Sequence, residues 1–157
     1  MFSRLSYWIP AIGVAILISV FSTQYFSAEH TSQVILPVLR WLFPFATSST
    51  LRLLHFGIRK AAHITEYAVF SVAAFHGVRG ARQGWRPQWA LITLFIAVSY
   101  ASLDEWHQSF VPVREAKFGD VLIDSAGAVL AQALIWGYAK LNRNSLPSPE
   151  LKEKAPS

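Results

Sequence analysis

Apolar residues are concentrated in four long runs, and polar residues fill the segments between them. The first run has no charged residue over a length close to the ~20 residues that cross the hydrocarbon core of a bilayer. The four runs are Tyr7–Phe26, Ala61–Val78, Gln88–Leu103 and Val121–Ala139. This pattern predicts an all-α, polytopic membrane protein with four transmembrane helices.

The chain ends in a polar segment rich in Pro, Ser and charged residues. We expect residues 1–141 to form one four-helix membrane domain and residues 142–157 to be a disordered cytoplasmic tail. Arg4 precedes the first apolar run, as a basic residue does in a signal peptide. Because no Ala-x-Ala cleavage site follows and three further runs do, we interpret this run as an uncleaved anchor.

The first predicted loop, residues 27–58, is itself partly apolar. Its segments Val34–Phe45 and Leu51–Ile58 are rich in aromatic or aliphatic residues but too short to cross a membrane, and Pro37 and Pro44 interrupt the first. We expect short amphipathic helices at the outer membrane interface. They would act either as a lid over a polar site or as a passive anchor.

Composition supports the membrane interpretation. Of the 157 residues, 53% are hydrophobic and 15% are charged, whereas soluble domains average ~25% charged residues. This argues against a soluble all-α domain with buried core helices. The absence of cysteine excludes disulfide bonds and thiol chemistry. The net charge of +5 is not arranged as a basic stripe with interleaved aromatic residues, so we expect no nucleic-acid partner.

Basic residues predict the orientation in the membrane. The short loop between the second and third runs contains Arg79, Arg82 and Arg86 and no acidic residue. Short basic loops remain on the cytoplasmic side, so both termini are predicted to be cytoplasmic. The outer ends of the second, third and fourth runs then lie at one depth.

Helical spacing groups the polar residues at these outer ends onto three faces. The faces comprise Arg59, His63 and Glu66; Tyr100, Asp104 and His107; and Asp120 and Asp124, which continue into Gly127 and Ala131. The Gly127–Ala131 pair is expected to let a neighbouring helix approach closely. An ionised group in hydrocarbon costs at least ~3 kcal/mol, so we expect the three faces to meet in one shared cluster.

The predicted cluster combines basic, acidic and imidazole groups. Its members are Arg59, Lys60, His63, Glu66, Asp104, Glu105, His107, Gln108, Arg114, Asp120 and Asp124. A structural explanation also exists for individual pairs, because Glu66 with Arg114, or Asp120 with Lys117, would fix the register of the helices. By contrast, His55 and His76 lie among apolar residues and are interpreted as packing or interface residues.

Three segments together resemble the signature of the VanZ-like family of small bacterial integral membrane proteins. They are R-K-A-A-H-I-T-E-Y (Arg59–Tyr67), D-E-W-H-Q-S-F-V-P-V-R (Asp104–Arg114) and D-V-L-I-D-S-A-G (Asp120–Gly127). The resemblance implies a multi-pass protein of the bacterial cytoplasmic (inner) membrane, with a motif core at residues 59–130. The namesake is linked to resistance to the glycopeptide teicoplanin, a property we do not transfer to this chain. Val113 and Asp124 depart from the pattern, which usually has Gly and often Asn at these places.

Three functions are compatible with such a cluster, and the sequence leaves open whether the protein is an enzyme. The first is recognition of an anionic lipid-linked component of the cell envelope, with Arg59, Lys60 and Arg114 as donors. The second is a metal-dependent membrane hydrolase or transferase acting on a lipid-linked substrate. Its candidate ligands for a divalent metal are His63, Glu66, Asp104, His107, Asp120 and Asp124. The third is proton-linked transport by an oligomer. The sequence predicts membrane lipids as partners and does not predict the oligomeric state.

Overall fold

The structure is a computed structural model that describes residues 4–111 and 118–144. Within these residues every regular element is a helix, which confirms the all-α prediction. The elements are η1 (Arg4–Trp8), α1 (Ile9–Phe21), η2 (Gln24–Phe26), α2 (Ala28–Leu42), α3 (Ser48–Arg79), α4 (Pro87–Gln108) and α5 (Phe118–Asn144). Helix α5 thus extends past the predicted domain boundary at residue 141, and the remainder of the predicted tail, residues 145–157, lies outside the described residues.

Local sequence signals account for the ends of the long helix α3. The hydroxyl of Thr47 accepts a hydrogen bond from the backbone N–H of Thr50 at 3.2 Å and so caps the first turn. Gly80 follows the last turn with a φ of 59°, a backbone conformation that side chains other than glycine rarely adopt. Helix α4 then begins at Pro87, whose missing N–H would have no partner in a first turn.

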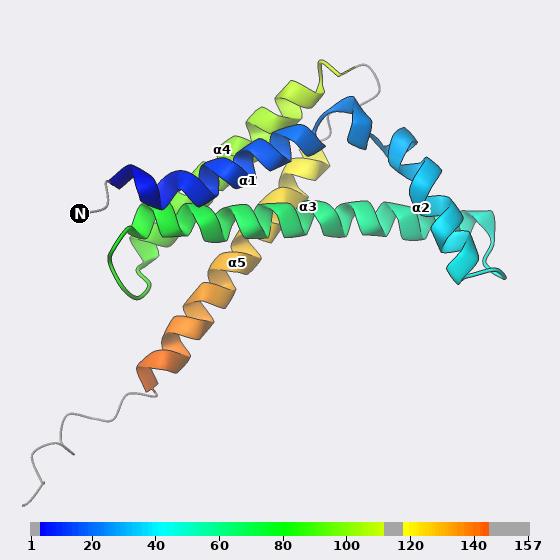
Figure 1. Ribbon diagram of the computed structural model, residues 1–157. Coiled ribbons are helices and arrows are strands. Elements are labelled where there is room, and N and C mark those ends of the chain that lie inside the picture. Colours follow the sequence, from blue (N-terminus) through cyan, green and yellow to red (C-terminus); the bar gives the residue numbers. More distant parts are fainter. Residues whose placement is uncertain (1–3, 112–117, 145–157) are drawn as a thin grey trace, which may run out of the picture.

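Helix α3 is the element on which the others are assembled (Figure 1). Helices α1 and α4 lie along its C-terminal half, α5 crosses it, and α2 packs near its N-terminal half. Tyr100 of α4 links α4 to α1, because its hydroxyl donates to the carbonyl of Ala15 at 2.7 Å. The elements that carry the predicted polar cluster are therefore brought to the middle of α3.

The structure corrects part of the prediction that the first loop forms short helices. Pro37 does not end α2, which continues to Leu42. Proline has no N–H, so the carbonyl of Gln33 four residues earlier loses its helical hydrogen bond, and Gln33 is exposed. The segment Leu51–Ile58 is not a separate interfacial helix but the first part of α3. No proline occurs between Thr47 and Gly80, so the helix continues without a break from this segment into the second apolar run.

The structure supports two of the four predicted membrane spans by length and hydropathy. In the described part of the chain, Arg4–Phe21 and Phe118–Asn142 are long and apolar enough to cross a membrane. The other two predicted spans lie on α3 and α4, where polar side chains such as His63, Glu66 and Asp104 lower the hydropathy. The four-span arrangement therefore stays a prediction.

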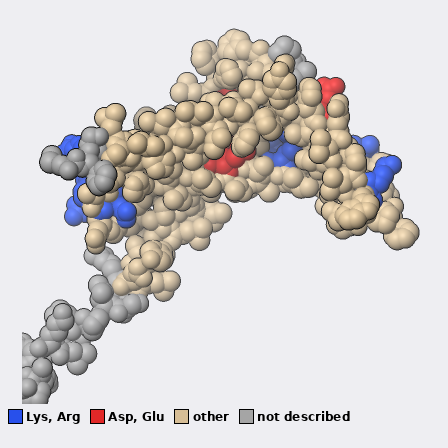
Figure 2. Space-filling view, viewed as in Figure 1, with Lys and Arg blue, Asp and Glu red and all other residues tan. Residues whose placement is uncertain are grey.

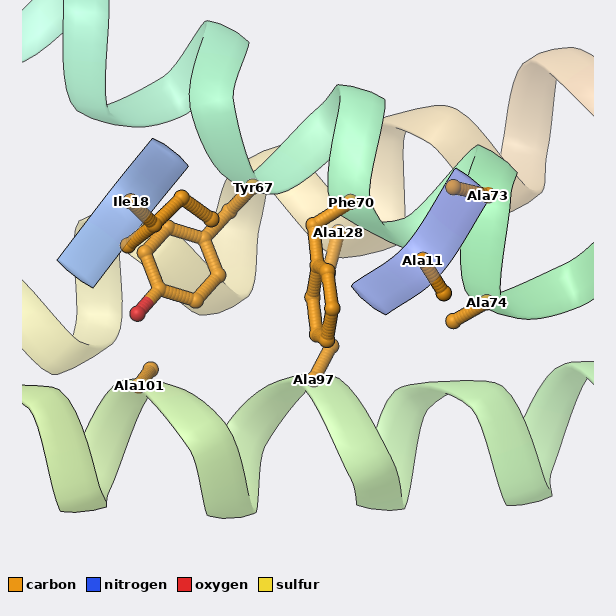
Figure 3. Close-up of a cluster of buried hydrophobic side chains, with 9 residues drawn as sticks. All are labelled: Ala11, Ile18, Tyr67, Phe70, Ala73, Ala74, Ala97, Ala101 and Ala128. Atoms are coloured by element: carbon orange, nitrogen blue, oxygen red, sulfur yellow. The ribbon is translucent and has the colours of Figure 1, made fainter. Parts of the chain in front are cut away.

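Alanines packed around a few large side chains form the core between the helices (Figure 3). The rings of Tyr67 and Phe70 on α3 point toward Ala101 and Ala97 of α4, and both alanines are fully buried. Helices α3 and α5 approach each other closely at Gly127, where an added Cβ would lie 2.3 Å from the carbonyl oxygen of Ile64. The predicted close approach at Gly127 is thus confirmed, and it sets the register of the polar residues nearby.

Candidate functional site

The close crossing at Gly127 brings two side-chain pairs together between α3 and α5. One turn before Gly127, Oδ1 of Asp124 lies 3.0 Å from Nδ1 of His63, and the side chain of Asp124 is fully buried. One further turn along both helices, Lys60 forms an ion pair with Asp120. Two of the predicted faces therefore meet, as the spacing of their residues predicts.

The geometry of the His63–Asp124 pair determines how the imidazole is oriented. A carboxylate only accepts hydrogen bonds, so Nδ1 of His63 carries the hydrogen and Nε2 is the nitrogen that this contact leaves unused. Within the described part of the chain, Oδ2 of Asp124 and the hydroxyl of Tyr67 are buried without a hydrogen-bond partner. Such buried polar atoms are rare in proteins and are typical of functional sites or of water positions.

A second polar group joins α1 to α4. The hydroxyl of Ser22 donates to Oδ2 of Asp104 at 2.8 Å, and the amide nitrogen of Gln108 donates to the same oxygen at 2.8 Å. The Gln108 amide also lies 3.2 Å from the Ser22 hydroxyl. All three side chains are buried, so this group holds its carboxylate by hydrogen bonds from uncharged donors.

Arg59 connects α3 to the segment before α2. Its Nη1 donates to the carbonyl of Phe26 at 3.0 Å and to the hydroxyl of Thr31 at 3.1 Å. Burial lowers the pKa of Arg59, and the carboxylates of Asp120 and Glu66 oppose that shift. On the preceding turn, burial and then the charge of Arg59 lower the pKa of His55, which favours a neutral imidazole 3.4 Å from Thr31.

A pocket of about 240 Å³ opens beside these groups, between α1, α2 and α3. Its apolar walls come from Phe21, Phe26, Ile35, Ile58 and Ala62, and its polar lining from Ser22, Thr31, Arg59, His63 and Glu66. Sequence reasoning identified Arg59, His63 and Glu66 but missed Ser22 and Thr31. Serine and threonine are common after an apolar run, and no spacing rule distinguishes these two.

The remaining members of the predicted cluster are placed differently. Glu105 is buried on α4, whereas His107 is exposed and does not join the cluster, which corrects the prediction. The physical reason is that Gln108, four residues after Asp104, occupies the inward position instead. The predicted partners Arg114 and Lys117 lie outside the described residues, and Asp120 pairs with Lys60 across the helices.

The two histidines assigned to packing fit that interpretation. His55 is buried, and His76 lies at the far end of α3 with its ring 5.6 Å from that of Tyr7.

The candidate metal ligands are not assembled as a set. Within residues 4–111 and 118–144, no three His, Asp or Glu side chains converge in a way that would hold a metal ion. His63 is bound to Asp124, Asp120 to Lys60, and Asp104 to Ser22 and Gln108. Each of these potential ligands thus already has a partner of its own, and the described side chains do not fit a metal centre.

A comparison with known families agrees with the resemblance carried by the three polar segments. The model of the VanZ/LLP1 family matches residues 6–140, which is most of the chain. The chain belongs to the VanZ/LLP1 family. The match extends beyond the polar segments to include the first apolar run, and membership together with the two candidate spans is consistent with a membrane location. No curated protein and no solved structure matches the chain.

Proposed function

We propose that this VanZ/LLP1 protein binds the headgroup of an anionic lipid or lipid-linked envelope component in the pocket between α1, α2 and α3. The observation that carries the proposal is the guanidinium of Arg59 in a pocket with apolar walls. Phosphate favours the planar donor fork of an arginine such as Arg59. The walls formed by Phe21, Phe26 and Ile35 suit the first carbons of a lipid chain.

The size of the pocket supports a headgroup as its occupant. Pockets for drug-sized ligands measure roughly 300–1,000 Å³, whereas this one measures about 240 Å³. A headgroup fits such a volume and a whole lipid does not, so the acyl or isoprenoid chain would remain in the bilayer. Helix α2 contributes Thr31 and Ile35 to the wall and so covers one side, which is the role proposed for the first loop as a lid.

The same proposal includes four spans with both termini in the cytoplasm. Helix α4 has 22 residues, and at ~1.5 Å per residue it is about 33 Å long, enough to cross a hydrocarbon core of ~30 Å. Figure 2 shows basic side chains at both ends of the molecule, but the end where α3 leads into α4 is the one with a short loop that contains Arg79, Arg82 and Arg86 and no acidic residue. The positive-inside rule assigns that end to the cytoplasm and the pocket to the outer side.

The binding proposal is tested by replacing Arg59 in nanodiscs that contain phosphatidylglycerol. Losing a charge-assisted contact of ~1.5–3 kcal/mol weakens binding roughly tenfold to a hundredfold. We expect this loss of retained lipid in Arg59→Gln, measured by native mass spectrometry. Arg59→Lys keeps the charge but not the fork, so it should show an intermediate loss.

Arg52 offers a matched control, because it is an exposed arginine on the same helix outside the pocket. Arg52→Gln should retain the lipid at the parent level. Equal retention by folded Arg59→Gln and Arg52→Gln would show that Arg59 is not part of a lipid site. Arg114 stays a predicted additional donor, and Arg114→Lys tests it in the same assay.

Orientation is tested with single cysteines in this cysteine-free chain. Gln83 lies in the basic loop and Ser109 follows the opposite end of α4, and both are exposed. An impermeant thiol reagent added to intact cells should label Ser109→Cys and not Gln83→Cys. The reverse pattern would place the pocket on the cytoplasmic side and contradict an envelope role.

A further inference from the structure

We infer that the pocket also cleaves what it binds: His63, oriented by Asp124, acts as the acid–base group for hydrolysis of a phosphodiester bond in the bound headgroup. The inference rests on the proposed function, because it takes the phosphate to lie beside Arg59. It adds an activity to a site that binding alone would explain only in part.

The first argument is the orientation of His63. Its Nδ1 is held 3.0 Å from Asp124, while the same side chain lines the pocket. Fixing Nδ1–H in this way leaves Nε2 as the basic nitrogen available to the pocket, which is the arrangement that acid–base catalysis by histidine requires. Arg59 lines the same pocket one helical turn earlier, so the imidazole and the anion-binding guanidinium belong to one site.

The second argument is the environment of Asp124. Its side chain is fully buried, and Oδ2 has no hydrogen-bond partner within the described residues. A residue that served only to hold two helices in register would not need a buried carboxylate with an unpartnered oxygen, since an uncharged hydrogen bond from Ser71 to the carbonyl of Ala128 joins the same two helices. A carboxylate is needed, however, to orient an imidazole and to stabilise it once it has taken a proton.

The charges at this end of the molecule indicate the class of substrate. Lys60 is paired with Asp120, and among the described lining residues Arg59 is the one side chain with a permanent positive charge. Asp124 and Glu66 add negative charge close by. One arginine in such surroundings matches the single negative charge of a phosphodiester better than the several charges of a diphosphate.

The reaction needs water as its second reactant. Nε2 of His63 takes a proton from the water as its oxygen forms a bond to phosphorus. The bond from phosphorus to the leaving alcohol oxygen breaks with its electron pair, and that oxygen takes the proton back from Nε2. The products are an alcohol and a phosphomonoester, and His63 returns to its neutral state. Arg59 would stabilise the negative charge that develops on the phosphoryl oxygens.

The test uses the full chain in nanodiscs with phosphatidylglycerol as the probe, and measures phosphatidic acid and diacylglycerol by mass spectrometry. We expect products from the parent protein above empty nanodiscs. In His63→Gln the rate should fall roughly a hundredfold to ten-thousandfold, the usual contribution of a general acid–base group. Lipid retention should stay within about twofold of the parent, because the phosphate contact is made by Arg59. His76→Gln, at the far end of α3, is the control and should cleave at the parent rate.

Asp124→Asn separates a positioning role from a structural one. It keeps the shape of the side chain but no longer requires hydrogen on Nδ1, so turnover should fall while lipid retention remains unchanged. Should His63→Gln fail to fold, this variant carries the test, and cleavage by folded Asp124→Asn at the parent rate would overturn the inference. Retention of the lipid by the parent without any product would also overturn it and leave the proposed function standing. A parent protein that retains no lipid would instead refute the proposed function itself.

Discussion

The two halves of α3 pack against the same helix, α5, by different means. Between Arg59 and Glu66 the contact includes two charged pairs, His63 with Asp124 and Lys60 with Asp120, beside the close approach of Gly127 to Ile64. Past Tyr67 it is made by small residues and uncharged hydrogen bonds, in which Ser71 donates to the carbonyl of Ala128. The second half makes its contact without a buried charge, whereas the first half carries the desolvation cost of its ionised groups.

The largest effect is expected where the charged half loses one partner. His63→Ala leaves the buried carboxylate of Asp124 without its partner, and removing one member of a buried pair costs ~3–5 kcal/mol. The free energy of unfolding in detergent would measure this loss. The double variant His63→Ala, Asp124→Ala should be more stable than the sum of the two single changes, whereas simple additivity would mean that the pair does not interact.

Next in size is the close contact that serves both halves. An alanine Cβ at Gly127 would lie 2.3 Å from the carbonyl of Ile64, so Gly127→Ala should destabilise the protein by ~3 kcal/mol, near the upper end for overpacking. Gly137, on the same helix, has open space around it. Gly137→Ala should be neutral or should stabilise by ~0.5–1 kcal/mol through helix propensity. Equal stability of the two variants would argue against the close crossing.

The hydrogen-bonded group of Ser22, Asp104 and Gln108 between α1 and α4 provides a third comparison. Ser22→Ala removes the hydroxyl that donates to Asp104 at 2.8 Å in a buried position. We expect a loss of ~1–2 kcal/mol, because the carboxylate keeps its bond from Gln108. Ser19→Ala on the same helix is the control: its residue is exposed, and Tyr100 still donates to Ala15. A thermal unfolding series in which the two serine variants match would show that the Asp104 group contributes nothing.

The smallest effect is expected for the outermost pair. The side chains of Lys60 and Asp120 are 22% and 18% exposed, so solvent screens them and the pair should contribute only ~0.2–1 kcal/mol. Lys60→Met should therefore lose less stability than His63→Ala. The difference between Lys60→Met and the parent should shrink further as salt rises from low to physiological concentration. A salt-independent loss as large as that of His63→Ala would show that the pair is desolvated.

The sequence predicted which residues belong to the polar end, but less of how they pair. Spacing along each helix correctly grouped Arg59, His63 and Glu66 on one side of α3, and all three line the pocket. On α4 the sequence assigned both His107 and Gln108 to the cluster, and the structure turns only Gln108 inward. Residues three and four positions after Asp104 both lie on the same side of a helix. Only packing against neighbouring helices, at residues such as Ala97 and Ala101, selects between them.

The sequence by itself determined the properties that depend on neighbours along the chain. These are the helical runs, their capping residues, a glycine small enough for a helix crossing, and the polar residues at the ends of apolar runs. The tertiary structure decided what depends on neighbours in space. His63 and Asp124 are 61 residues apart, and their contact exists because α5 crosses α3 at Gly127. The pocket likewise needs Ser22 and Thr31 from elements that no periodicity connects to α3. Periodicity reports the face on which a side chain lies, whereas its partner is set by how whole helices pack.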